Sequence, residues 1–228
     1  MTPVPERRVA PRYAGRLGVG ALIVATGFGL VGTGVSKLTP ASRDVGTIPT
    51  VATVPPPPGT VPPASARSQT ARPEDLAVPF VPLRIGVPGR ALEATVLPVG
   101  VERGGQVAVP SDAGTVGWWS GGALPGVGSG TVVLVGHVDA AGGLEGALYM
   151  ARRWQPGDRI VLGGAGGRSA SYSVVARRQY DKNDLPARDV FGQGAAPRLV
   201  LVTCGGPFDA ATRHYRDNLV VYAVPSGD

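Results

Sequence analysis

The sequence predicts an all-β domain, a closed barrel or a sandwich, in residues 79–228. Three observations predict it: short apolar segments with strand periodicity, Gly- and Pro-rich turns between them, and no alternation of strands with helices. The expected strands cover residues 81–87, 131–135, 159–162, 171–175, 198–202 and 219–224. One short helix is expected at 144–154, where Leu144, Leu148 and Trp154 can share a face.

A long apolar run lies near the N-terminus. Residues 17–36 contain no charged side chain over 20 positions, the length that a helix needs to cross about 30 Å of hydrocarbon. Four arginines precede the run within residues 1–16, whereas only Lys37 and Arg43 follow it closely. This bias predicts a single-pass membrane anchor with residues 1–16 in the cytoplasm and the remaining chain outside the cell membrane. A cleaved signal peptide is the competing interpretation, but the run is longer than a usual signal core.

A Pro-rich segment separates this run from the predicted domain. Residues 37–78 are rich in Pro, Thr, Ser and Ala, include four consecutive prolines at 55–58, and lack apolar periodicity. Such a composition is typical of an extended, semi-rigid spacer. At about 3.1 Å per residue the spacer could reach on the order of 100 Å outside the membrane.

The charge is concentrated in the N-terminal third of the chain. The formal net charge is +6, but residues 1–70 hold 7 Lys and Arg against 2 acidic residues. Residues 71–228 hold 15 Lys and Arg against 14 acidic residues, so the predicted domain is nearly neutral. A nucleic-acid partner is therefore not expected, because such a partner requires a basic surface on the folded domain.

Cys204 is the only cysteine of the chain. Exported proteins usually pair their cysteines, and a single cysteine has no partner within its own chain. Two interpretations remain open on this count: a buried thiol that packs as a small apolar group, or a reactive thiol.

Three residues with complementary chemistry lie at the ends of predicted strands. His137 follows the apolar strand 131–135, and Cys204 follows the apolar strand 198–202. A thiol needs a nearby base or cation to ionise, and a histidine can supply this and later return the proton to a leaving amine. Arg216 directly precedes the last strand, where a fixed guanidinium can stabilise a tetrahedral oxyanion. Arg213 is the alternative, but it lies in the middle of the expected loop.

The sequence motifs around these residues are similar to those of a known family. The segment 201–209 reads Leu-Val-Thr-Cys-Gly-Gly-Pro-Phe-Asp, and 214–218 reads His-Tyr-Arg-Asp-Asn. Further matching segments are 110–119, 125–126 and 136–139. Together they resemble the sortases of Gram-positive bacteria, most nearly the class F type of actinobacteria. One departure is that the family's usual Thr-Leu-x-Thr-Cys has an apolar residue here in place of the first Thr.

The resemblance implies a closed eight-stranded β-barrel with one or two short helices and a two-step transpeptidation. Cys204 would cleave a Leu-Pro-x-Thr-Gly-like sorting signal between Thr and Gly through a thioester, with His137 as acid and base and Arg216 at the oxyanion. An amine of a peptidoglycan precursor or of another protein would then take the acyl group. Thr203 is expected to contact substrate, and Asp139 to orient His137 or merely to cap a turn. By analogy the segment 180–197 forms a wall of the substrate groove.

Neither a cofactor nor a metal ion is expected, and the enzyme is expected to be a monomer. Other cysteine peptidase classes fit less well, since papain-like folds place the cysteine before the histidine in the chain. Cysteine L,D-transpeptidases carry an arginine two positions after the cysteine, where Gly206 stands here. A non-enzymatic alternative is an anchored β-domain that binds wall or protein partners and merely buries Cys204. The accessibility of the thiol distinguishes these readings.

Overall fold

The computed structural model describes residues 44–49, 78–140, 143–194 and 196–227. Within those ranges no helix has the length and apolar character needed to cross a membrane. The predicted anchor at 17–36, the preceding residues 1–16 and most of the predicted spacer lie outside the described residues.

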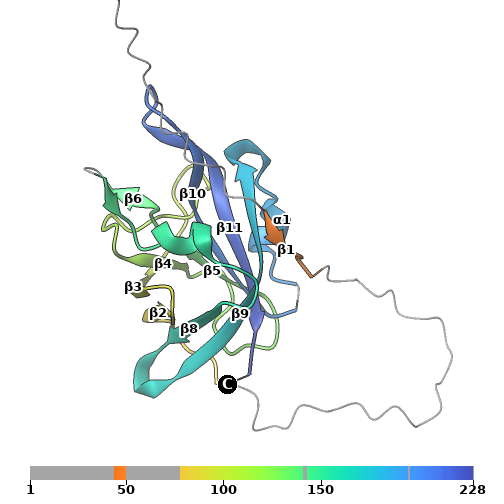
Figure 1. Cartoon of the computed structure of the whole chain (residues 1–228). Helices are drawn as coiled ribbons and strands as arrows, with labels where there is room; N and C mark the ends of the chain where they lie inside the picture. The colour runs from red at the N-terminus through yellow and green to blue at the C-terminus, as the bar shows by residue number, and fades with distance from the viewer. Residues whose placement is uncertain (1–43, 50–77, 141–142, 195, 228) are drawn as a thin grey trace, which may run out of the picture. The chain divides into compact units, whose positions relative to one another are not determined.

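Eight strands close into a barrel (Figure 1). Around the barrel their order is β9 (Ser169–Asp181), β11 (His214–Pro225), β10 (Arg198–Asp209), β5 (Thr131–Val135), β4 (Val116–Trp119), β3 (Leu92–Val99), β2 (Arg84–Val87) and β8 (Arg159–Gly163). β8 then pairs back with β9 and closes the circle. Two neighbouring pairs, β10–β5 and β3–β4, are parallel, and the other barrel pairs are antiparallel. The predicted all-β closed barrel is confirmed.

The strand positions agree with the prediction where apolar residues are dense. β5 and β8 match the expected segments closely, whereas β9, β10 and β11 extend well beyond them into polar sequence. In the expected strand 81–87 only the second half pairs: Ile85 and Val87 are buried, but Val81 and Leu83 are exposed. β3 and β4 were not predicted.

The expected helix at 144–154 is wrong in its first half. Leu144 belongs to the short strand β7 (Leu144–Glu145), which pairs with β6 (Asp139–Ala140), and its side chain is exposed. The second half forms the 3₁₀ helix η2 (Tyr149–Arg153), flanked by the buried Leu148 and Trp154. The remaining short helices are η3 (Ala165–Gly167), η4 (Lys182–Asp184) and α1 (Ala187–Phe191). The helix fails because the turn at Gly143 adopts φ 79°, which pairs β6 with β7 instead.

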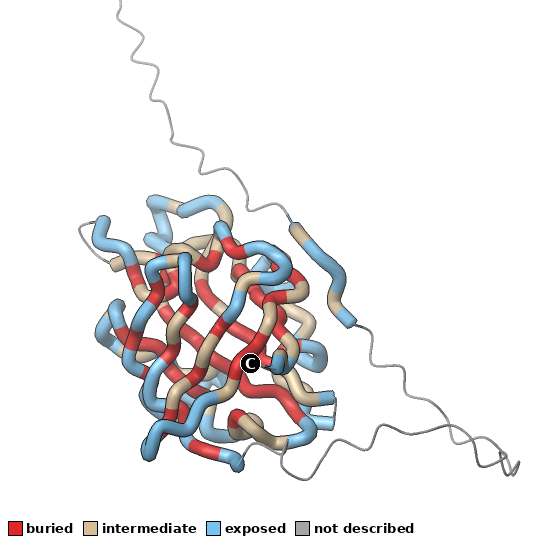
Figure 2. The backbone as a smooth tube through the Cα atoms, turned by 60° about the horizontal axis from the view of Figure 1, so that its bottom comes forward, coloured by how far each residue is buried: buried red, intermediate tan, exposed pale blue. Residues whose placement is uncertain are grey.

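Two apolar clusters lie on opposite sides of the β9–β11–β10 region. Buried residues alternate with exposed or half-buried ones along β2, β3 and β8, whereas β5 is buried along its whole length; Figure 2 colours the backbone by burial. The larger cluster fills the barrel and includes Leu199 and Leu201 of β10. The smaller cluster lies outside the barrel wall and includes Val200 of β10 and Val190 of α1. We call the two sides of the wall the inner face and the outer face.

An additional strand, β1 (Val45–Gly46), pairs with β9 and was not foreseen within the predicted spacer. The Arg178 guanidinium donates to the carbonyls of Val45 (2.6 Å) and Gly46 (2.7 Å), and Ile48 packs into the outer cluster. Gly46 has φ 73°, and a Cβ atom there would lie 2.0 Å from the Val175 carbonyl oxygen. Only glycine therefore allows this segment to lie against β9. The folded unit thus includes residues 44–49, beside α1 in Figure 1.

Candidate active site

Cys204 lies in β10, between β5 on one side and β11 on the other. Side chains alternate along a strand, so Cys204 shares the outer face with Val200 and Val202, which belong to or pack against the outer cluster. Its side chain is half-buried and forms no disulfide. The sequence predicts that this strand ends near Cys204. Instead, β10 continues to Asp209 and forms a long hairpin with β11. The cysteine is therefore held on both sides by neighbouring backbone.

His137 follows β5 at the same level as Cys204. Each residue of β5 pairs with the β10 residue 67 positions later, from Thr131 with Arg198 to Val135 with Val202. The Gly136 amide continues this parallel pattern by donating to the Val202 carbonyl at 3.2 Å. β5 ends at Val135, and the same register continued for two more residues would set His137 opposite Cys204, where neighbouring strands lie about 4.8 Å apart. The alternation of Val133 and Val135, continued in the same way, would direct the His137 side chain to the outer face.

The His137 ring and backbone both have defined partners. The ring Nε2 lies 2.8 Å from the Pro110 carbonyl oxygen, and because a carbonyl only accepts, Nε2 carries the proton. The His137 carbonyl accepts from the Leu148 amide at 2.9 Å. A Cβ atom at Gly146 would lie 2.4 Å from that carbonyl oxygen, so this loop packs tightly against His137. The imidazole is thus oriented with Nδ1 as the atom left to exchange a proton with a partner.

Arg216 lies on β11 diagonally across from Cys204. Asn218 is the direct partner of Cys204, and Arg216 is two residues further along the same face. Such diagonal neighbours have Cβ atoms about 7–8 Å apart, within reach of a long side chain. The Arg216 charge also helps to lower the pKa of Asp209, after the backbone amides of Ala211 and Thr212 that bind this carboxyl. Arg213, in contrast, lies at the hairpin tip with φ 58°, at the far end from Cys204.

A bulge directly after Cys204 bends the hairpin. The register shifts between Gly205 and Phe208, and Gly206 adopts φ 73°. A Cβ atom at Gly206 would lie 2.1 Å from Asp217 Oδ2, so glycine is required there for steric reasons too. The bulge therefore changes the course of the hairpin between Cys204 on β10 and Arg216 on β11.

The segment 180–197 covers part of the outer face next to this arrangement. β9 continues to Asp181, and α1 follows and packs on β5, where the Thr131 hydroxyl donates to the Gly192 carbonyl at 2.6 Å. Phe191 meets Trp119 of β4 edge to face, with ring centroids 5.7 Å apart. This segment, expected by analogy to form a wall of the substrate groove, contains η4 and α1.

The match to a known family decides the identity of the fold. Residues 85–226 match the sortase domain family, which covers the barrel and all three of these side chains. The chain belongs to the sortase family. Sortases are cysteine transpeptidases, and Cys204 is the single cysteine of this chain.

Solved sortase structures share this fold at low sequence identity. A lid mutant of sortase A from Corynebacterium diphtheriae has a TM-score of 0.50 and 18% identity, covering 67% of this chain and 73% of that chain. Sortase C1 from Streptococcus agalactiae has a TM-score of 0.48 and 19% identity, covering 64% and 67%. Among curated proteins, no match to this chain was found.

Thr203 and Asp139, the two other predicted site residues, have surroundings in this sortase that differ from those expected. Thr203 is only 4% exposed, belongs to the inner face by alternation with Leu201, and its Oγ1 has no hydrogen-bond partner among the residues that the structure describes. Its side chain therefore lies on the opposite side of β10 from Cys204. Asp139 accepts a hydrogen bond from the Tyr215 hydroxyl, and His137 is oriented by Pro110. Pro110 and Tyr215 both lie in segments that resemble the sortase motifs. Their contacts could not be predicted from the sequence, because they form between segments that are distant in the chain.

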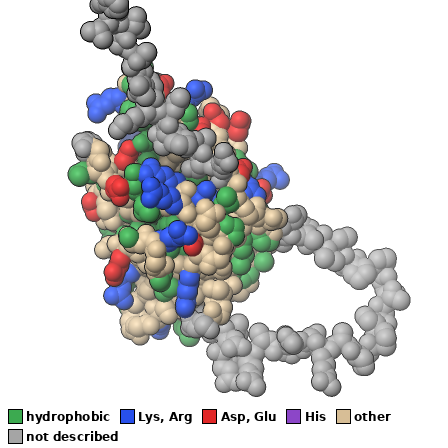
Figure 3. All heavy atoms as spheres, in the orientation of Figure 1, with side chains coloured by type: hydrophobic (Ala, Val, Ile, Leu, Met, Phe, Trp, Pro, Cys, Tyr) green, Lys and Arg blue, Asp and Glu red, His purple; other side chains and the backbone are tan. Residues whose placement is uncertain are grey.

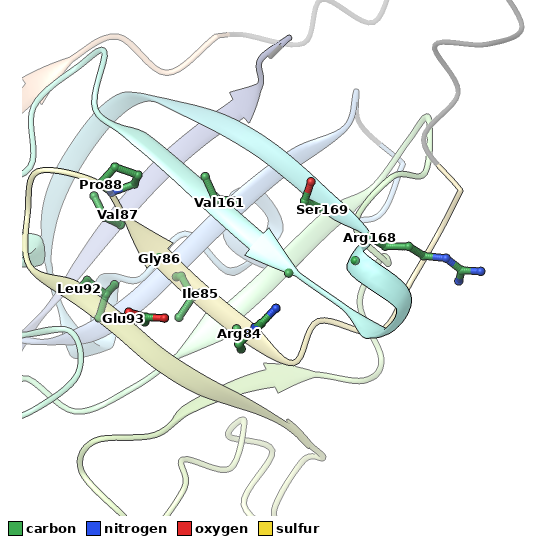
Figure 4. A pocket seen from close by; sticks show the side chains of 12 residues that line it. Arg84, Ile85, Gly86, Val87, Pro88, Leu92, Glu93, Val161, Arg168 and Ser169 are labelled. Atoms are coloured by element: carbon green, nitrogen blue, oxygen red, sulfur yellow. The ribbon is translucent and has the colours of Figure 1, made fainter.

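Two cavities accompany the barrel of the sortase. One of about 690 Å³ is lined by Asp139, Phe208, Arg213 and Tyr215, next to the candidate site. The other, of about 360 Å³, lies on β2, β3, β8 and β9 and includes Arg84 and Arg168 (Figure 4). None of the three predicted catalytic residues lines either of these cavities.

Charges and metal ligands add little to the site. On the face shown in Figure 3, Lys and Arg side chains are interspersed with Asp and Glu. In the part of the chain that the structure describes, no group of three or more His, Cys, Asp or Glu is arranged to hold a metal ion.

Proposed function

We propose that this sortase uses Cys204 as nucleophile, His137 as acid and base, and Arg216 as oxyanion stabiliser. The observation that carries the proposal is the register of three adjacent segments. The β5–β10 pairing supports His137 beside Cys204, and the β10–β11 pairing supports Arg216 diagonally across from it, all on the outer face. A thiol, a base and a fixed cation on one face are the parts that acyl transfer requires.

The proposed reaction has two steps. The Cys204 thiolate attacks the Thr carbonyl carbon of the sorting signal, and a C–S bond forms while the Arg216 guanidinium stabilises the oxyanion. Collapse breaks the Thr–Gly amide bond, and the leaving amine takes a proton from the His137 imidazolium. An acceptor amine then attacks the thioester, gives a proton to His137 and releases the thiolate as the new amide forms.

The finer features of the proposal rest on the sequence. The sequence motifs at 201–209 and 214–218 support the class F type and a Leu-Pro-x-Thr-Gly-like sorting signal. The proposed acceptor is an amine of a peptidoglycan precursor or of another protein, and the proposed enzyme is a monomer. The segment 180–197, which packs on the outer face, supports a wall of the substrate groove.

We also propose a single-pass anchor at 17–36, with the catalytic domain outside the cytoplasm. The docked strand β1 changes what this anchor implies, because only residues 37–43 then join it to the barrel. Seven residues span at most about 25 Å. The proposed enzyme therefore acts close to the membrane, and not at the end of a 100 Å spacer as the composition of 37–78 alone suggested.

The test is turnover of a quenched Leu-Pro-x-Thr-Gly peptide by the full chain in detergent, with and without an amine acceptor. Mass spectrometry should find an acyl adduct on Cys204 and an acceptor-joined product, both absent from Cys204→Ala. If no variant of the peptide forms an adduct and the thiol resists alkylation, the catalytic proposal is wrong. The anchored binding domain would then be the better account.

A further inference from the structure

Tyr215 connects the two parts of the candidate site. It lies on β11, one residue before Arg216, and its hydroxyl donates a hydrogen bond to Asp139 Oδ2 on β6. Asp139 is two residues after His137 in the same short segment. The bond therefore joins the hairpin that carries Cys204 and Arg216 to the segment that carries His137.

The setting of Tyr215 keeps this bond in one geometry. Its ring packs against Phe208 at a centroid distance of 5.2 Å and an interplanar angle of 65°, beyond the bulge that follows Cys204. By alternation with Leu219 it belongs to the inner-face register of β11, and its side chain is half-buried. A hydroxyl bound to a carboxylate forms one of the stronger hydrogen bonds found in proteins.

The hydroxyl stays protonated and remains a donor. Burial, the bond to Asp139 and the nearby Cys204 raise the pKa of Tyr215 to about 12, with a smaller opposing effect from Arg152. Tyr215 thus acts as a constant donor over the pH range in which a thiol and an imidazole exchange protons.

We propose that Tyr215 is a positioning residue, which holds the His137 segment against Cys204 through its hydrogen bond to Asp139. The backbone of His137 is already bound by Leu148 on one side, and the Tyr215–Asp139 bond secures the other side of the segment, toward β11. This inference rests on the proposed function, because it gives Asp139 a role in placing His137 through Tyr215 rather than by touching the imidazole.

The test compares Tyr215→Phe, Asp139→Ala and the double variant with the wild-type full chain. Tyr215→Phe keeps the ring against Phe208 and removes only the hydroxyl. We expect kcat to fall about 10- to 100-fold, the range typical of a small misplacement of reacting groups, while KM changes less than about twofold. The double variant should be no slower than the slower single variant, because both changes remove the same bond.

A second readout does not need the peptide substrate. Iodoacetamide should alkylate the sole cysteine several-fold more slowly at pH 7 in Tyr215→Phe, because His137 no longer supports the thiolate. Tyr149→Phe is the matched control: it removes a hydroxyl from a ring that stacks with Arg152 at 3.6 Å and should change neither readout.

The inference is overturned by wild-type kcat and alkylation in Tyr215→Phe, or by effects of the two single variants that multiply in the double variant. A raised KM with unchanged kcat also contradicts it, since that pattern indicates a contact with substrate. If the wild type has no turnover at all, the proposed function fails, and the alkylation rates still decide whether Tyr215 influences Cys204.

Discussion

Replacing Gly46 by alanine should release β1 from β9 while leaving the barrel core intact. Gly46 has φ 73°, and a Cβ atom at this position would lie 2.0 Å from the Val175 carbonyl oxygen, far inside van der Waals contact. The atom is backbone, so no rotamer change can relieve the clash. The docked strand must therefore move away.

The magnitude follows from what docking holds in place. Undocking breaks the two Arg178 bonds to β1 carbonyls, the Thr47 amide bond to Val175 (3.2 Å) and the Gln179 amide bond to Asp44 Oδ1 (3.0 Å). Such bonds contribute about 0.5–3 kcal/mol each, and ordering a residue costs about 1–2 kcal/mol. The two contributions largely offset each other over residues 44–49, so we expect a loss of about 1–3 kcal/mol in the free energy of unfolding. That loss lowers Tm by about 3–10 °C.

Hydrogen exchange is the decisive assay because it reports docking directly. The Thr47 and Gln179 amides should lose their protection in Gly46→Ala, whereas the amides of β10 should keep theirs. Gly89→Ala is the matched control, since Gly89 also has a left-handed φ of 77° but a Cβ atom there meets nothing within 4 Å. It should show strain without loss of protection at Thr47. Unchanged protection in Gly46→Ala would refute the reasoning.

The same variant tests the proposed closeness to the membrane. In vesicles that hold the full chain, Gly46→Ala lengthens the connection between the proposed anchor and the barrel from residues 37–43 to residues 37–77. We expect it to cleave sorting signals presented further from the bilayer than the wild type can reach. Equal reach of the two proteins would show that β1 does not limit the tether.

The remaining predictions concern the proposed reaction. Cys204→Ala should abolish turnover in the peptide assay, and any residual cleavage would show that another residue is the nucleophile. His137→Ala should lower kcat about 10²–10⁴-fold through lost proton transfer, whereas His214→Ala, at the exposed start of β11, should not. Arg216→Lys should also slow turnover severely because an ammonium does not reproduce the guanidinium fork, and normal rates would remove Arg216 from the site. Thr203→Val should leave turnover unchanged and stability equal or higher, measured by thermal unfolding, because its buried hydroxyl has no hydrogen-bond partner within the described ranges.

Dense apolar segments were predictable because their pattern depends on local sequence alone. The runs at 131–135 and 159–162 are rich in β-branched residues and became β5 and β8. β3 and β4 were not predicted because Pro98 and Gly117 weaken the local strand pattern. Only pairing with neighbouring strands in the barrel makes these segments strands. β1 was not predicted either, because its pairing depends on Arg178, which lies far along the chain.

The sequence by itself determined the fold class, the single thiol, and the order of His137, Cys204 and Arg216 along the chain. These are properties of composition, of strand periodicity and of motif wording, and none requires knowledge of distant contacts. Only the tertiary structure decided that β5 and β10 pair in parallel, with a register that runs from Thr131 opposite Arg198 to Val135 opposite Val202. It also decided that Thr203 lies on the inner face, that Asp139 binds Tyr215, and that residues 44–49 belong to the barrel. The physical reason is that strand register, strand faces and edge pairing are set by contacts between segments far apart in the chain, which a local pattern does not specify.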